Sequence, residues 1–220
     1  MVPASENGEM NSKRFTKINV MKIEYKIPES LKEITLGQYQ DFLKLKESLE
    51  KETIDDFQFM MQSIKIFASG DLTKLEKLPQ SKVSEIFELV MGIFQKETNQ
   101  LHKVVTIQGK EYGMHSDLSE ITTAEFADIQ EYQKKGFQDN LHNILAVLYR
   151  PIKRKHKHLY ALEPYNGTDE RPQLFKKHFP CDAVNGCLVF FSTISSELLA
   201  ISLSYLQAQA ENKNSKQAEQ

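Results

Sequence analysis

The sequence is similar to itself at a constant spacing, and this similarity constrains the fold more than any other feature of the chain. Residues 23–41, IEYKIPESLKEITLGQYQD, align without gaps with residues 110–128, KEYGMHSDLSEITTAEFAD, at an offset of 87. The identical pairs are Glu24/Glu111, Tyr25/Tyr112, Leu31/Leu118, Glu33/Glu120, Ile34/Ile121, Thr35/Thr122 and Asp41/Asp128. Because similarity at a fixed period is typical of repeated structural units, we predict two related pseudo-repeats.

Each pseudo-repeat is predicted to begin with extended backbone. The first contains INVMKIEYKIP, residues 18–28, whose β-branched and aromatic residues favour a strand or short hairpin that ends at Pro28. The second contains VVTIQGKEYGM, residues 104–114, in which Gln108, Gly109 and Lys110 lie between two extended pieces. Gly at this place favours a tight hairpin turn.

A helix start is predicted directly after each shared segment. Thr35 is followed three residues later by Gln38, and Thr122 by Glu125. This is the spacing of a capping box, in which the Thr hydroxyl and the later side chain satisfy N–H groups at the helix N-terminus. We therefore predict helices from Leu36 onward and from Thr123 onward.

Further apolar helices are expected over residues 54–68, ended by Gly70, and over residues 137–149, ended by Pro151. A weaker similarity relates residues 78–93 to residues 179–194 at an offset of 101. The change of offset from 87 to 101 implies about 14 extra residues in the second half. We expect them in an inserted basic loop within residues 150–170, which is rich in Pro, Gly and charge.

These features predict an α+β fold that is predominantly α-helical. The first pseudo-repeat covers residues 16–101 and the second residues 102–207, each a short strand or hairpin followed by about three helices. The ends of the chain are polar and poor in bulky side chains. Residues 1–15 and 208–220 are therefore predicted to be disordered.

The last predicted helix has apolar residues at alternating steps of four and three, which is typical of a long apolar seam. Such a wide apolar face needs burial either in the core or against a partner. If it contacts a partner, the contact residues are Phe190, Phe191, Ile194, Leu198 and Ile201.

The strongest charge cluster is the run from Lys153 to His158 in a chain whose formal charge is only −2. Lys153, Arg154, Lys155 and Lys157 are the candidate contacts to nucleic acid, because cations there could bind phosphates. The rest of the chain is not basic, so we favour a solvated loop and do not expect nucleic acid as the partner.

No pattern in the chain indicates catalysis. The nucleophile elbow GxSxG, the phosphate loop GxxxxGK[ST] and the dinucleotide motif GxGxxG are all absent. His156, His158 and Cys181 do not have the spacing of a metal site, although a small metal-dependent enzyme using them is one alternative. We predict no catalytic, cofactor-binding or metal-binding residues.

The start of the chain lacks the apolar core of a secretory signal. The most apolar stretch, Gly186 to Leu206, contains Glu197 near its middle, and a carboxylate there would be costly in a bilayer. We therefore expect a soluble protein without a membrane partner.

Three segments carry a resemblance to a known class of proteins. They are IPESLKEITLGQYQDFLKL at 27–45, ILAVLYRPI at 144–152, and YNGTDERPQLFKKHFP at 165–180 with VNGCLVFF at 184–191. As a set they resemble structural or tail-assembly proteins of tailed bacteriophages, including crAss-like phages.

The resemblance implies a non-enzymatic role in virion assembly, as a tail assembly chaperone or as a component of the tail or head–tail junction. The implied partners are phage structural or tail proteins, or further copies of the chain. The implied location is the host cytoplasm during assembly, or the virion. The alternative function is that of a nucleic-acid-binding phage protein that uses the basic loop 153–158.

Overall fold

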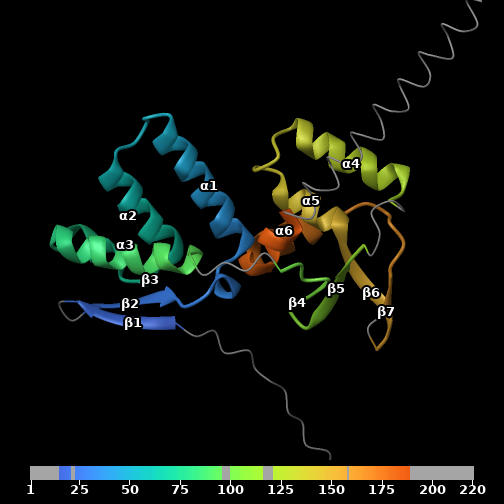
Figure 1. The fold of residues 1–220 in the computed structure, drawn as a ribbon, viewed down its shortest axis with the longest axis horizontal. Coiled ribbons are helices and arrows are strands. Elements are labelled where there is room, and N and C mark those ends of the chain that lie inside the picture. Colours follow the sequence, from blue (N-terminus) through green and yellow to red (C-terminus); the bar gives the residue numbers. More distant parts are fainter. Residues whose placement is uncertain (1–14, 21–22, 96–99, 116–120, 158, 189–220) are drawn as a thin grey trace, which may run out of the picture. The chain divides into compact units, whose positions relative to one another are not determined.

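The computed structural model describes residues 15–20, 23–95, 100–115, 121–157 and 159–188 (Figure 1). Within these residues the chain is 56% helical, with eight helices and two small sheets, so the predicted helix-rich α+β class is confirmed. The chain divides into two compact units, unit 1 over Met1–Glu97 and unit 2 over Thr98–Gln220. Each is described by itself.

The sheet of unit 1 is a hairpin with a short third strand. Strands β1 (Phe15–Val20) and β2 (Ile23–Pro28) pair antiparallel, and β2 also pairs with β3 (Ser69–Gly70). The hairpin prediction is thus confirmed, including its end at Pro28. Tyr25 of β2 lies opposite Gly70 and is fully buried.

Helices cover one side of this hairpin (Figure 1). They are the 3₁₀ helices η1 (Leu31–Glu33) and η2 (Leu72–Lys77), and the α-helices α1 (Leu36–Glu50), α2 (Asp56–Phe67) and α3 (Gln80–Phe94). Helix α2 contacts both α1 and α3, and α3 contacts β2. The rings of Phe42, Phe67 and Phe94 pack together at centroid distances of 5.2–5.3 Å and form part of the core.

Unit 2 has a four-stranded antiparallel sheet in the order β4-β5-β6-β7. Its strands are β4 (Val104–Ile107), β5 (Lys110–Met114), β6 (Tyr149–His156) and β7 (Leu159–Leu162). Gln108 and Gly109 connect β4 to β5 with φ values of 50° and 79°. These positive angles are those of a tight hairpin turn, so this prediction is confirmed.

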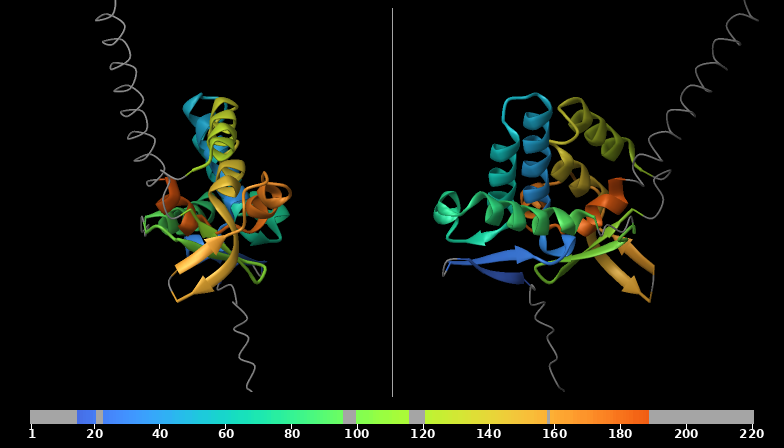
Figure 2. Two further views of the ribbon diagram at one scale, coloured as in Figure 1. Left: turned by 90° about the vertical axis from the view of Figure 1, so that its right-hand side faces the viewer. Right: turned by 60° about the vertical axis from the view of Figure 1, so that its left-hand side comes forward.

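Three labelled helices complete unit 2 (Figure 2). They are α4 (Thr123–Lys134), α5 (Leu141–Leu148) and α6 (Arg171–His178), and residues 181–188 are also helical. Helix α5 contacts α4, α6 and β6. Its residues Ile144–Leu148 are all buried, which places α5 at the centre of this unit.

Both predicted capping boxes are present. The N–H of Gln38 donates to Thr35 Oγ1 (3.3 Å), and Gln38 Oε1 accepts from the Thr35 N–H (3.0 Å). In unit 2 the N–H of Glu125 donates to Thr122 Oγ1 (3.3 Å), and Glu125 Oε2 accepts from the Thr122 N–H (2.9 Å). A third box, formed by Asp55 and Gln58, starts α2.

Replacing either capping threonine with alanine is expected to lower the free energy of unfolding by about 1 kcal/mol, because an N–H group at the helix start loses its acceptor. Urea denaturation of Thr35→Ala and Thr122→Ala, followed by circular dichroism, measures this loss. Serine at the same positions keeps the hydroxyl and is the control. Equal losses for alanine and serine would show that the hydroxyl is not the cause.

The segment after α4 differs from the prediction. Helix α5 begins at Leu141 and ends at Leu148, so it is shorter than the helix predicted over 137–149 and differs from it mainly at the start. The residue before a proline is disfavoured in the helical conformation, and Arg150 is extended in β6, so the predicted end of the helix ahead of Pro151 is confirmed. The predicted inserted loop is likewise wrong in part, since β6 and β7 form a hairpin within it.

Unit 1 shows a similar difference at the end of α2. The helix ends at Phe67, ahead of Gly70, which belongs to β3 and not to a helix terminus. Gly70 has a φ of 128°, which favours glycine, and it pairs with Tyr25. The backbone is already extended from Ala68 onward, so α2 ends before Gly70.

Some local features agree between the units at the offset of 87. Ile18 lies opposite Tyr25, and Val105 opposite Tyr112. Other features differ. The strand that follows the second α-helix is β3 in unit 1, with two residues, and β6 in unit 2, with eight residues. Only β6 pairs with a further strand, β7. The prediction of two pseudo-repeats is not confirmed and stays a prediction.

Candidate functional site

The predicted partner-binding residues cannot be placed. Phe190, Phe191, Ile194, Leu198 and Ile201 all lie outside the described residues, which end at Leu188. Of the predicted disordered segments 1–15 and 208–220, residues 1–14 and 208–220 lie outside them as well, whereas Phe15 is the first residue of β1.

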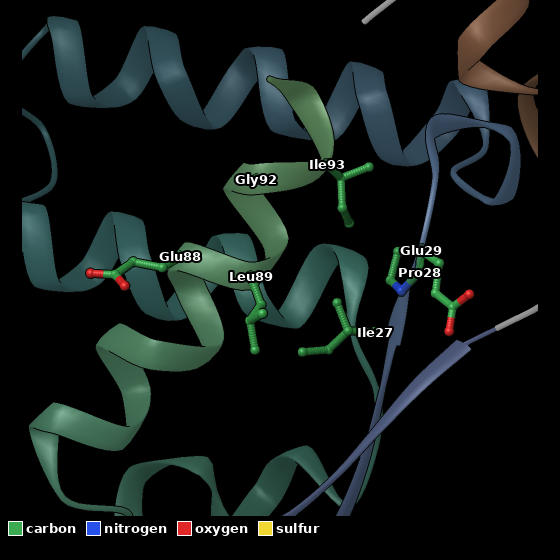
Figure 3. Close-up of a pocket in the computed structure, with 7 residues that line it drawn as sticks. All are labelled: Ile27, Pro28, Glu29, Glu88, Leu89, Gly92 and Ile93. Atoms are coloured by element: carbon green, nitrogen blue, oxygen red, sulfur yellow. The ribbon is translucent and has the colours of Figure 1, made fainter. Parts of the chain in front are cut away.

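Unit 1 carries an apolar groove between the end of β2 and the helix α3 (Figure 3). Its volume is about 440 Å³. Its lining residues are Ile27, Pro28, Glu29, Glu88, Leu89, Gly92 and Ile93, and we call this set the α3 groove. Figure 3 shows the Leu89 and Ile27 side chains directed toward each other across it.

Helix α3 contributes residues on one face to the groove. Leu89, Gly92 and Ile93 are three and four residues apart, so they share one face of the helix. Gly92 leaves a gap in this face, because a Cβ built there meets no atom within 4 Å. Ile93 is buried, whereas Leu89 is 45% exposed.

Two acidic residues line the same groove. Glu29 and Glu88 are exposed, and Figure 3 places their side chains at opposite ends of it. No lysine or arginine is among the seven lining residues. The groove therefore combines an apolar floor with a negative rim, a surface suited to apolar side chains that are flanked by cations.

One sequence signal could have indicated this groove. The buried stripe of α3 consists of Val83, Ile86, Val90 and Ile93, at steps of three and four. Leu89 is equally apolar but lies off this stripe. The sequence places Leu89 three residues before Gly92, but it does not show which segment lies opposite them. Strand β2 lies there only in the folded unit.

The predicted nucleic-acid contacts are brought together by the structure, although not on a loop. Lys153, Arg154 and Lys155 belong to β6, and Lys157 lies in the turn that follows. All four side chains are exposed. Lys155 forms an ion pair with Glu111 of β5.

Unit 2 has a wider depression beside α6, with a volume of about 1060 Å³. Its charges balance, since Lys110, Arg171 and Lys177 are matched by three acidic residues, Glu163, Asp169 and Glu170. Burial lowers the pKa of Arg171, whose Nη2 donates to the Gly167 carbonyl (2.5 Å). With balanced charge, this depression does not favour a ligand of either sign.

A buried ion pair in unit 2 was missed by sequence reasoning. Arg150 Nη2 lies 3.4 Å from Glu125 Oε1, and the two side chains are 9% and 3% exposed. The other oxygen of Glu125 completes the capping box with Thr122. One carboxylate therefore ties the start of α4 to strand β6, which is a structural role.

The buried Cys187 thiol is not activated as a nucleophile. Burial raises the pKa of Cys187 to about 12, so its thiol is protonated at neutral pH and is a poor nucleophile. Among the residues that the structure describes, no three His, Cys, Asp or Glu side chains are placed to hold a metal ion. His178, one of the histidines near Cys181, contacts the Gln108 side chain instead (3.1 Å).

Comparison of the chain with protein families, curated proteins and solved structures gave no significant match. In the described part of the chain, none of the helices combines the length and the apolar character needed to cross a membrane.

Proposed function

We propose that this chain is a non-enzymatic bacteriophage protein that acts in assembly or in the virion through protein contacts. A tail assembly chaperone or a component of the tail or head–tail junction fits best, working in the host cytoplasm during assembly. The resemblance of residues 27–45, 144–152 and 165–191 supports the phage assignment. The observation that carries the role in protein contact is the α3 groove.

The groove suggests the chemistry of its partner. An apolar side chain of the partner could lie between Leu89 and Ile27, next to Gly92. It would move from water to an apolar surface, and this burial is the main favourable contribution to protein association. Lysine or arginine beside that side chain would approach the carboxylates of Glu29 and Glu88. The proposed occupant is therefore a segment of a tail or capsid subunit that carries an apolar anchor flanked by cations.

The test uses purified tail and capsid subunits of the phage that encodes this chain, with binding measured by calorimetry or pull-down. Leu89→Glu is expected to weaken binding at least tenfold, because it places a carboxylate in the contact. The matched control is Leu159→Glu, since Leu159 is 76% exposed on β7 and lies outside the groove. Absence of binding to every subunit, or equal loss in both variants, would contradict the proposal.

A second variant separates binding from folding. Gly92→Ala adds a methyl group to the groove without meeting another atom within 4 Å. Because glycine in a helix interior is less favourable than alanine, the variant should be more stable by up to about 1 kcal/mol. It should nevertheless bind the subunit more weakly. If Gly92→Ala is more stable and its binding is unchanged, the α3 groove is not part of the interface.

A further inference from the structure

The hairpin of β6 and β7 extends beyond the sheet of unit 2. Tyr149–Pro151 of β6 pair with β5, whereas the pairing of Ile152–His156 is with β7 only. Residues 152–156 and 159–162 therefore form a two-stranded ribbon, which together with Lys157 in the turn we call the basic ribbon. Figures 1 and 2 show it directed away from the helices α4 and α5 of the same unit.

The charge of the basic ribbon has one sign. Residues 149–162 contain no aspartate or glutamate. Lys155 is neutralised by Glu111 of the neighbouring strand. Lys153, Arg154 and Lys157 are exposed and have no acidic partner among the described residues. Three uncompensated cations thus lie within five residues of one another.

The ribbon is held in place by contacts to the sheet. The Tyr160 hydroxyl donates to the carbonyl of Met114 (2.7 Å), and its ring lies so close to Gly113 that a Cβ there would come within 2.5 Å of the ring. Lys155 lies opposite Tyr160 and shares its face, whereas Arg154 lies opposite Ala161 on the other face. Cations on an ordered ribbon lose less conformational entropy on binding than cations on a flexible loop.

We propose that the basic ribbon binds the phosphate backbone of double-stranded DNA. The major groove, about 12 Å wide, admits a two-stranded β-ribbon, and lysine and arginine there contact phosphates without reading the sequence. Single strands are usually bound by exposed aromatic rings on which bases stack. Of the aromatic rings of this hairpin, Tyr149 is fully buried and the half-buried Tyr160 packs against Gly113, which favours the duplex.

The inference goes beyond the proposed function, since it concerns a surface in unit 2 and a different partner. If the basic ribbon does not bind DNA, the proposed role of the α3 groove is unaffected, and the converse also holds. It also changes the expectation from the sequence, which favoured a solvated loop. The change follows from the ordered strands, because Lys153 and Arg154 lie on a strand that pairs with β7 and not on a loop.

The test is fluorescence anisotropy of a labelled 20-base-pair duplex with the full chain, titrated between about 50 and 200 mM salt. Each phosphate contact contributes a slope of about 0.9 in log affinity against log salt, so three contacts predict a loss of roughly 40-fold over this range. The variant Lys153→Gln/Arg154→Gln/Lys157→Gln is expected to bind at least tenfold more weakly at about 50 mM salt and to lose most of that slope.

The matched control is Lys32→Gln/Lys46→Gln/Lys77→Gln, which removes three positive charges from exposed sites in unit 1. It should bind DNA like the wild type. Equal weakening in both triple variants would mean that net charge alone attracts DNA and would overturn the proposal. So would the absence of wild-type binding at about 50 mM salt, or tighter binding to a single strand of equal length. Circular dichroism confirms that each variant is folded.

Discussion

Replacing Arg150 with methionine is expected to lower the free energy of unfolding of unit 2 by about 3–5 kcal/mol, because the buried carboxylate of Glu125 then has no cation to balance it. The pair is separated by 3.4 Å, and neither side chain is more than 9% exposed. Solvent therefore cannot take over the role of the missing guanidinium. The methionine side chain fills much of the same volume, so the loss reports charge more than packing.

Urea denaturation gives the total effect, and hydrogen exchange followed by mass spectrometry assigns it to peptides that cover α4 and β6. Lys155→Met is the control, since it breaks the exposed pair with Glu111 and should cost no more than about 1 kcal/mol. The double variant Glu125→Gln/Arg150→Met should recover part of the loss. Equal costs for Arg150→Met and Lys155→Met would show that burial of the Arg150 pair has no energetic consequence.

Phe175→Ala is expected to destabilise unit 2 by about 3–5 kcal/mol, because it removes a fully buried ring and leaves a cavity. The Phe175 ring packs at 5.1 Å from the rings of both Tyr112 and Phe179, measured between centroids. It therefore joins α6 to strand β5 and to the segment after α6.

Phe126→Ala is the matched control in the same unit, because the Phe126 side chain on α4 is 41% exposed. Urea denaturation of both variants, monitored by circular dichroism, should give a clearly smaller loss for Phe126→Ala. If the two losses are equal, the arrangement of rings around Phe175 is not the core of unit 2.

Features that depend on neighbouring residues were predictable. Thr35 and Thr122 cap helices because the hydroxyl and the N–H groups that it satisfies are within three residues of each other. The turn at Gln108 and Gly109 is equally local, since it depends on backbone angles that glycine adopts readily. The helix-rich α+β class follows from many such local signals added along the chain.

The basic run shows where this reasoning ends. Its composition indicated charge and exposure, and both are observed for Lys153, Arg154 and Lys157. Its conformation depends on β5, which offers pairing to β6 across a separation of nearly forty residues, as in Tyr112 opposite Pro151. A segment rich in proline and charge resembles a loop until a partner strand is available.

The capped helix starts at Thr35 and Thr122, the turn at Gln108 and Gly109 and the positions of charge follow from the sequence alone, because each depends on residues close together in the chain. The pairing of Glu125 with Arg150, the groove that β2 and α3 form around Leu89, and the ordered ribbon of the basic run appear only in the folded units. The physical reason is that these features are made by pairs of segments distant in sequence, whose contact depends on the packing of a whole unit.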